Sequence, residues 1–276
     1  MFLVTGATGN VGRQVVARLL VAGVPVRGLA RTPVGLPAGV EAVAGDLTEP
    51  GTLPGALAGV RAAFLFPVPG CGPAFAAAAR AAGVGRIVAL SSAGIIDGTV
   101  AQPDLVTGFH AEIEQAVEAS GIPWTFVRCG AFATNTLQWA GQIRSGDTVS
   151  APYPRASFAP VHEADVAAVI ARALTGDGHT GARYRVTGPA ALTQAEQLAV
   201  IGAALGRELR LVEVPPQVAR ERMVQRLPAP IVDGLLRVFA EATRRPAEVL
   251  PTVAEVTGRP PRSFAQWAAD HRADFR

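Results

Sequence analysis

Short apolar stretches alternate with longer amphipathic segments along the first half of the chain. A short apolar run predicts a buried strand, and apolar positions that recur at helical spacing predict a helix. Strands are expected at Phe2–Val4, Val24–Ala30, Val40–Ala44, Ala62–Phe66, Arg86–Ser91 and Trp124–Arg128, with helices up to Leu20, at Phe75–Ala82 and at Phe109–Ala119. Because each helix carries the chain back across the sheet, this alternation predicts an α/β fold with a doubly wound parallel (Rossmann) sheet.

Beyond Gly130 the alternation is lost. Helices are expected at Ala131–Ile143, His162–Leu174, Thr193–Leu205 and after Pro216, Pro230 and Pro261, with strands at Arg183–Val186 and Leu209–Val214. We therefore predict a nucleotide-binding core over residues 1–150, with a returning strand near 183–187. Residues 151–276 are expected to form mostly a small helical, substrate-binding lobe over the carboxyl edge of the sheet, where ligands bind in such folds.

Three glycines, Gly6, Gly9 and Gly12, lie between the first strand and the first helix. A strand, a glycine-rich turn and a helix form the geometry that binds the pyrophosphate of a dinucleotide, because backbone N–H groups then approach the phosphate oxygens. The GxxGxxG spacing favours the short-chain dehydrogenase branch of Rossmann proteins. The alternative is a glycine-rich turn without a ligand. The predicted contacts are Gly6, Thr8, Gly9, Asn10, Val11 and Gly12.

Composition supports a folded protein. Of 276 residues, 49% are hydrophobic and 17% charged, which provides a sizeable core and argues against disorder. The net charge of +3 comes from arginines spread along the chain, so neither nucleic-acid nor membrane binding is expected. Cys71 and Cys129 have no metal-ligand spacing, and no metal site is predicted. Without a leader or a long apolar segment, the protein is expected in the cytoplasm.

The cofactor expected is NADP(H), with NAD(H) as the alternative. NAD sites usually carry an acidic residue at the end of the second strand, but here that position is followed by Arg31, which suits a 2′-phosphate. Arg13 is a second phosphate candidate. Asp46 is assigned either to the adenine amino group or to capping the segment that begins at Thr48. Phe66 and Ser91, at the ends of the fourth and fifth strands, complete the predicted cofactor contacts.

The usual catalytic pair of short-chain reductases is missing. In a Tyr-x-x-x-Lys motif, lysine lowers the tyrosine pKa so that the phenol exchanges a proton with the substrate. This chain contains no lysine, and neither Tyr153 nor Tyr184 lies in the helix before the sixth strand. Ser92, which follows Ser91 at the carboxyl edge, is retained as a catalytic candidate.

Several segments together resemble the NmrA-like atypical short-chain dehydrogenases. They are Gly6–Gly12, Gly45-Asp46, Ser91-Ser92, His110–Arg128 and Ala159–Asp165, and the resemblance spans about residues 1–190. That family includes NADPH-dependent quinone reductases, redox-sensing regulators and tailoring enzymes of actinomycete aromatic polyketide pathways. The implied alignment puts His110 in place of the lysine and Val106 in place of the tyrosine. Arg128-Cys129-Gly130 departs from the family's more usual Arg-Pro-Gly.

His110 is the second catalytic candidate. As an imidazole near the nicotinamide ribose, it would hold the ribose hydroxyls or relay a proton. The alternative is a half-buried helix residue that packs with Ile113 and Val117. His162 and Asp165 lie on one helical face, and we expect them to cap the helix and pack the lobe rather than react. No role is predicted for His179 or His271.

Phe132, Asn135 and Trp139 recur at helical spacing after the sixth strand. Two aromatic faces and one amide suit a flat aromatic substrate, although the same spacing also fits the core face of a helix.

The function predicted is hydride transfer from NADPH to a quinone or an aromatic, polyketide-like ketone. Water, Ser92 or His110 would complete the protonation. The alternatives are an aromatic polyketide tailoring hydroxylase or monooxygenase, and a non-catalytic NADP(H)-sensing regulator. The expected partner is a small aromatic substrate, and the expected state is a monomer or homodimer.

Overall fold

Seven parallel strands form the central sheet of this computed structural model, which describes all residues from Met1 to Arg276. The strands are β1 (Phe2–Thr5), β2 (Val26–Ala30), β3 (Val40–Ala44), β4 (Ala62–Leu65), β5 (Arg86–Ser92), β6 (Trp124–Cys129) and β9 (Ala182–Val186). Their order is β3-β2-β1-β4-β5-β6-β9, and every pairing is parallel. The predicted doubly wound Rossmann sheet is confirmed. The strand order reverses between β1 and β4, which is where such sheets bind nucleotides.

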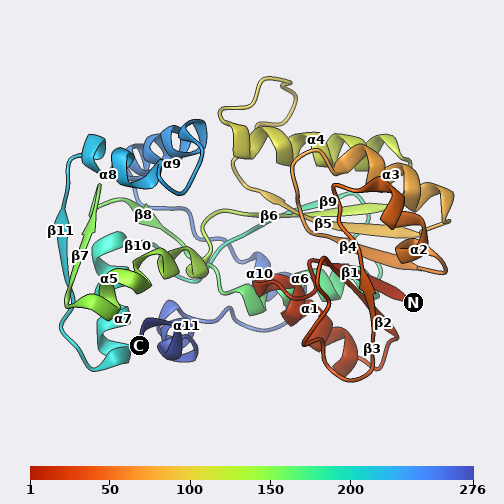
Figure 1. The fold of residues 1–276 in the computed structure, drawn as a ribbon, viewed down its shortest axis with the longest axis horizontal. Helices are drawn as coiled ribbons and strands as arrows, with labels where there is room; N and C mark the ends of the chain where they lie inside the picture. The colour runs from red at the N-terminus through yellow and green to blue at the C-terminus, as the bar shows by residue number, and fades with distance from the viewer.

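Helices cover both faces of the sheet (Figure 1). One face carries α1 (Asn10–Val21), α6 (Glu163–Thr175) and α10 (Thr252–Thr257), and the other carries α2 (Leu53–Leu57), α3 (Gly72–Ala81) and α4 (Leu105–Ala119). Because central parallel strands are buried on both faces, they read as continuous apolar runs, and β1 and β4 are buried throughout. Two separate apolar clusters of 23 and 19 buried residues result, one on each side.

The remaining elements form a second part, on the left in Figure 1. Its α-helices are α5 (Ala140–Ser145), α7 (Gln194–Leu205), α8 (Pro216–Met223), α9 (Ala229–Ala242) and α11 (Phe264–Asp270). It also contains two short 3₁₀ helices, η2 (Ala133–Trp139) and η3 (Arg272–Phe275). The third 3₁₀ helix, η1 (Pro50–Thr52), belongs to the core. Its two small sheets pair β7 (Thr148–Ala151) with β11 (Arg210–Glu213), and β8 (Ser157–Phe158) with β10 (Leu192–Thr193). This lobe has its own core, centred on Trp267. No helix in the structure has the length and apolar character needed to cross a membrane.

Local signals explain where the predicted helices differ. Helix α4 begins at Leu105 rather than Phe109, because the Asp104 carboxylate accepts a hydrogen bond from the Thr107 N–H at 2.8 Å and caps the first turn. The predicted helix over 131–143 is a 3₁₀ segment followed by α5. Short elements such as β7 and α10 were not predicted, since a few residues carry too little periodicity.

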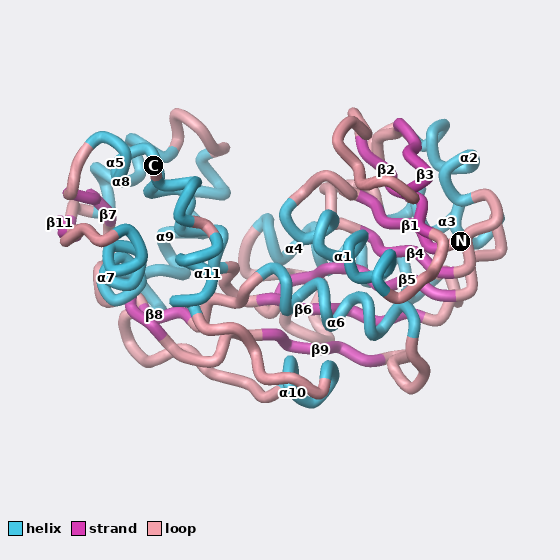
Figure 2. Tube along the Cα trace, turned by 90° about the horizontal axis from the view of Figure 1, so that it is seen from below, coloured by secondary structure: helices cyan, strands magenta, loops and turns pink.

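The chain passes between the core and the lobe repeatedly, as Figure 2 shows from below. Helix α6 packs against α1, and strand β9 pairs with β6, although both follow residue 150. Conversely, α5 and β7 lie in the lobe near the predicted boundary. The division at residue 150 into a nucleotide-binding part and a substrate-binding part remains a prediction.

A buried polar cluster joins the lobe to the core. Glu163, at the start of α6, accepts hydrogen bonds from Trp267 Nε1 at 3.1 Å and His271 Nε2 at 2.7 Å. His162 caps the same helix by accepting from the Ala164 N–H at 3.1 Å. Burial opposes charge on His162, but its contacts with Glu163, Asp270 and Asp165 together outweigh burial and raise the histidine pKa. His271, for which no role was predicted, contributes to the contact between α6 and α11 through its bond to Glu163.

Candidate active site

The turn between β1 and α1 needs glycine at Gly6 and Gly12. Gly6 has φ 60°, in the left-handed region. A Cβ on Gly12 would lie 2.1 Å from the Gly6 carbonyl oxygen, so only glycine allows α1 to start this close to β1. The Gly9 N–H donates to the Gly6 oxygen at 2.9 Å and closes the turn.

A second set of bonds fixes the turn against β4. Thr5 Oγ1 donates to the Phe64 carbonyl at 3.0 Å and accepts from the Phe66 N–H at 2.7 Å. No side chain caps the start of α1, so its first N–H groups face outward without a capping partner. Because these donors lie at a helix N-terminus and the glycines leave the approach open, the turn fits a dinucleotide pyrophosphate. Thr8 and Asn10 are exposed beside it, while Val11 is buried beneath.

The adenosine side of the site carries exposed arginines. Arg31 directly follows β2, and Arg13 lies in the first turn of α1; neither makes an ion pair. Asp46 lies close enough to Arg31 to feel its charge, but its carboxylate accepts from both the N–H and the hydroxyl of Thr48, at 2.9 and 2.8 Å. Both bonds lower the Asp46 pKa, and the bond from the Thr48 backbone N–H has the larger effect. Asp46 therefore caps the segment that begins at Thr48, which was one of its two predicted roles. Its contact with adenine remains a prediction.

Ser91 and Ser92 end β5 but face different partners. Ser91 is buried, and its hydroxyl donates to Glu114 Oε1 at 2.5 Å. Ser92 Oγ accepts from the Gly94 N–H at 3.2 Å and lines the cleft described below. Phe66 is partly exposed and lies against Gly6, directly after the end of β4.

A buried ionic network lies behind these serines, and it was not predicted from the sequence. The Arg128 guanidinium donates to both carboxylate oxygens of Glu114, at 2.9 and 2.6 Å, and both side chains are only 5% exposed. It also bonds to both oxygens of Asp97, in the loop after β5, at 3.0 and 2.7 Å. The Glu114 and Asp97 bonds raise the Arg128 pKa, and the Arg128 bond lowers the pKa of Asp97. The only sequence signal for this network was Glu114, which lies one helical turn after His110 in α4.

His110 is half-buried in α4. Its Nδ1 lies 2.7 Å from the Val106 carbonyl, which only accepts, so Nδ1 carries the proton and donates. Burial lowers the His110 pKa, and the Val106, Glu114 and Asp104 contacts offset this only in part. The neutral imidazole therefore dominates near neutral pH, with Nε2 as an acceptor. The ring also stacks on Phe109, with centroids 4.2 Å apart.

A cleft of about 650 Å³ opens at the carboxyl ends of β5, β6 and β9, beneath α9. Half of its lining is hydrophobic, including Phe158, Ile231 and Val238. It brings together two of the predicted site residues, Ser92 and Asn135.

The other two predicted substrate contacts lie elsewhere. Phe132 packs against the apolar cluster under α1 and α6, and Trp139 is buried in the lobe core and borders a second cavity. The two side chains thus pack into different apolar clusters rather than on one helix face, and their contact with substrate remains a prediction.

A family model described as NAD(P)H-binding matches residues 6–177, more than half of the chain. The chain belongs to this NAD(P)H-binding family. The match contains the glycine turn, both serines and the α4 network, and it confirms the resemblance to the NmrA-like atypical short-chain dehydrogenases.

Two curated relatives of this NAD(P)H-binding protein cover its full length. One, from Streptomyces griseus, is 45% identical over 100% of this chain and 99% of its own; it is named (4-alkanoyl-5-oxo-2,5-dihydrofuran-3-yl)methyl phosphate reductase. The other, an NAD(P)H azoreductase from Xenophilus azovorans, is 37% identical over 100% and 99% of the two chains. The prediction of an NAD(P)H-dependent reductase is confirmed.

Among solved structures, the NADPH complex of an Escherichia coli quinone oxidoreductase matches with a TM-score of 0.81 over 98% of this chain and 99% of its own, at 24% identity. A Citrobacter triphenylmethane reductase matches with a TM-score of 0.80 over 99% and 100% of the two chains, at 20% identity. At these identities the matches establish the fold of the core and the lobe together.

Proposed function

We propose that the protein is an NADPH-dependent reductase for quinones and similarly electron-poor conjugated carbonyl compounds, aromatic polyketide-like ketones included. The observation that carries the proposal is the absence of a Tyr-Lys pair from a half-apolar cleft at the carboxyl ends of β5, β6 and β9, in the same sheet whose first strand leads into the glycine turn. Bound NADPH supplies a hydride from its nicotinamide ring. Because no tyrosine, histidine or lysine lines the cleft, the acceptor has to stabilise the resulting anion itself.

The residues of the chain then position the acceptor and handle its proton. The apolar wall excludes water from one face of the acceptor, and Ser92 and Asn135 offer a hydroxyl and an amide to its oxygens. In a quinone, the hydride adds two electrons, and the anion formed takes one proton from water or Ser92 to give the hydroquinone. His110, neutral and with Nε2 as an acceptor, would hold a ribose hydroxyl rather than supply that proton.

The substrates in the names of the relatives fit the same chemistry. The furanone in the name of the Streptomyces enzyme has a C=C bond conjugated to two carbonyl groups, so hydride addition to it also yields a stabilised anion. An acyl butenolide of this kind is the second candidate substrate, and the apolar cleft residues on α9, such as Leu235 and Val238, would face its alkanoyl chain.

Turnover should separate acceptors by how well they stabilise an anion. With menadione, an acyl butenolide and acetophenone, we expect steady NADPH oxidation for the first two and a rate lower by roughly a hundredfold or more for the isolated ketone, since a positioned general acid contributes about that much. Loss of NADPH absorbance measures this. Equal rates for the ketone would contradict the proposal.

Two further measurements, NADPH binding and oxygen uptake, separate the alternatives. Tight NADPH binding without turnover on any acceptor would favour a cofactor-sensing regulator. Oxygen uptake with a polycyclic phenol would favour a tailoring hydroxylase. Location in the cytoplasm, a monomer or homodimer, and a small aromatic partner complete the proposal.

Preference for NADPH over NADH should depend on Arg31. Arg31→Ala is expected to raise the Kd of NADPH about 10- to 100-fold by removing charge-assisted bonds to the 2′-phosphate, and to leave NADH binding nearly unchanged. Titration of cofactor fluorescence measures both. Arg61→Ala, which removes an exposed charge far from the turn, is the matched control. Equal effects on the two cofactors would show that Arg31 does not bind the phosphate.

The low pKa of His110 should appear in the pH dependence of stability. The unfolded chain binds a proton near pH 6.5, whereas the folded chain binds it only at lower pH, so His110 makes the free energy of unfolding fall as pH drops below about 6.5. His110→Asn keeps a donor for the Val106 carbonyl but does not titrate. We expect its unfolding free energy, measured in urea at several pH values, to fall less on acidification than that of the wild type. Parallel curves would contradict this.

A further inference from the structure

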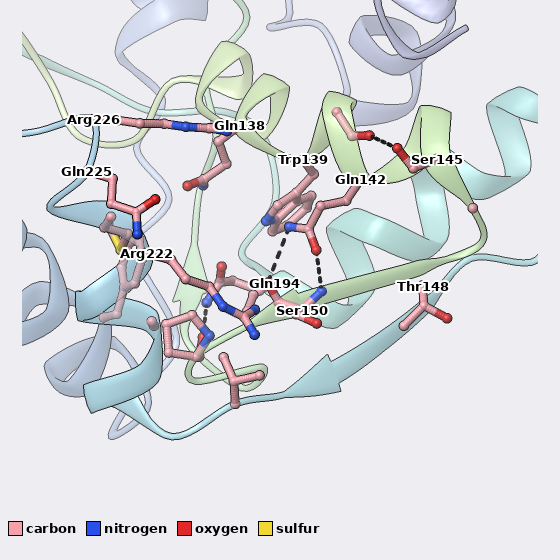
Figure 3. Close-up of a pocket in the computed structure, with 18 of the residues that line it drawn as sticks. Gln138, Trp139, Gln142, Ser145, Thr148, Ser150, Gln194, Arg222, Gln225 and Arg226 are labelled. Atoms are coloured by element: carbon pink, nitrogen blue, oxygen red, sulfur yellow. Dashed lines mark hydrogen bonds between the residues drawn. The ribbon is translucent and has the colours of Figure 1, made fainter.

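The lobe contains a second cavity, of about 930 Å³, between α5, β7 and α8. It is separate from the cleft over the sheet, although Phe239 lines both. Figure 3 shows its walls, with α5 on one side and α8 with the turn after it on the other. Only 7 of its 20 lining residues are hydrophobic, and nothing in the proposed reduction uses it. The chemistry-bearing residues are Gln138, Gln142, Ser150, Gln194, Arg222, Gln225 and Arg226.

Two arginines of this cavity have no counter-charge. Arg222 lies in the last turn of α8 and Arg226 in the turn that follows the helix. Both are exposed residues that line the cavity, and neither has a carboxylate partner or a side-chain hydrogen bond. Like charges that face one space repel. The single acidic residue in the lining, Asp147, is already paired with Arg207 at 2.7 Å. The neighbouring Arg220 on α8 shows the usual arrangement, since it pairs with Asp233 at 2.6 Å.

The amides of the cavity divide into two kinds. Gln142 accepts from the Ser150 N–H at 2.8 Å and Gln194 donates to the Pro152 carbonyl at 2.8 Å, so these two fix the wall. The side chains of Gln138 and Gln225 make no hydrogen bond within the protein and keep free N–H donors. The cavity thus presents two uncompensated cations and two free amides around one space.

We propose that this cavity is a binding site for the phosphate monoester of a small organic molecule. A phosphate monoester carries a charge of about −1.5 to −2 near neutral pH and three acceptor oxygens, which matches two guanidinium groups and two amides. The organic part packs against Trp139, Val214 and Phe239 on the apolar part of the wall. The volume lies in the range of small-molecule sites.

Phenyl phosphate is the probe, and calorimetric titration measures its binding. We expect Arg222→Gln and Arg226→Gln each to weaken binding about tenfold or more, and added salt to weaken it in the wild type. Arg61→Gln, with the same loss of charge in the distant core, should bind like the wild type. Unchanged thermal unfolding shows that the variants are folded. No binding at roughly millimolar probe, or equal binding by all variants, overturns the proposal.

Steady-state kinetics with the neutral acceptor menadione then identify the molecule that carries the phosphate. If phenyl phosphate raises the KM for menadione, the two cavities hold parts of one substrate, joined at Phe239. If the KM is unchanged while phenyl phosphate binds, the phosphate belongs to a separate effector. Both results retain the arginine site, because the calorimetric titration tests that site without any acceptor.

Discussion

Gly12→Ala is expected to abolish measurable NADPH binding, weakening it by roughly a hundredfold or more. The added Cβ would lie 2.1 Å from the Gly6 oxygen and 2.7 Å from the Gly6 carbonyl carbon, so α1 has to move away from β1. That movement displaces the N–H groups that face the pyrophosphate. Titration of NADPH fluorescence measures the loss.

Gly55→Ala is the matched control, because a Cβ there meets nothing within 4 Å. It should bind NADPH like the wild type. If Gly12→Ala retains full affinity while remaining folded, the glycine turn is not the pyrophosphate site.

Arg128→Met is expected to lower the free energy of unfolding by about 3–5 kcal/mol, because it leaves the buried Glu114 carboxylate without its partner. For a chain of this size the melting temperature should fall on the order of 10 °C. Thermal unfolding followed by circular dichroism measures it. The loss should exceed that from Arg220→Gln, which removes an exposed ion pair and should have little effect.

A double variant separates charge from packing. Adding Glu114→Gln to Arg128→Met removes the stranded charge, so part of the lost stability should return. If the double variant is as unstable as the sum of the two single variants, the buried ion pair is not the cause.

The sheet and the glycine turn were predictable because their signals are local. A buried parallel strand is an unbroken apolar run, and Gly6, Gly9 and Gly12 lie within one turn of the chain. The start of α4 needed only Asp104 and Thr107, three residues apart, but the apolar pattern there gave Phe109.

The parts of the site that were missed depend on distant pairings. Arg128 meets Glu114 and Asp97, which are 14 and 31 residues away, only after β5, β6 and α4 have packed together. Helical spacing also does not tell which face of a segment is core. Trp139 and Asn135 fit the same pattern, yet Trp139 is buried in the lobe and Asn135 lines the cleft.

The repeated crossing of the chain between core and lobe limits how this protein can be divided or recombined. The edge strand β9 and helix α6 belong to the core but follow α5 and β7 of the lobe in the chain. A fragment of residues 1–150 would expose the edge of β6 and the apolar face of α1. A swap of everything after residue 150 between relatives, made to exchange acceptor specificity, would therefore also replace β9 and disrupt the sheet. Grafting only α8 and α9, which are adjacent in the chain, would leave the sheet whole.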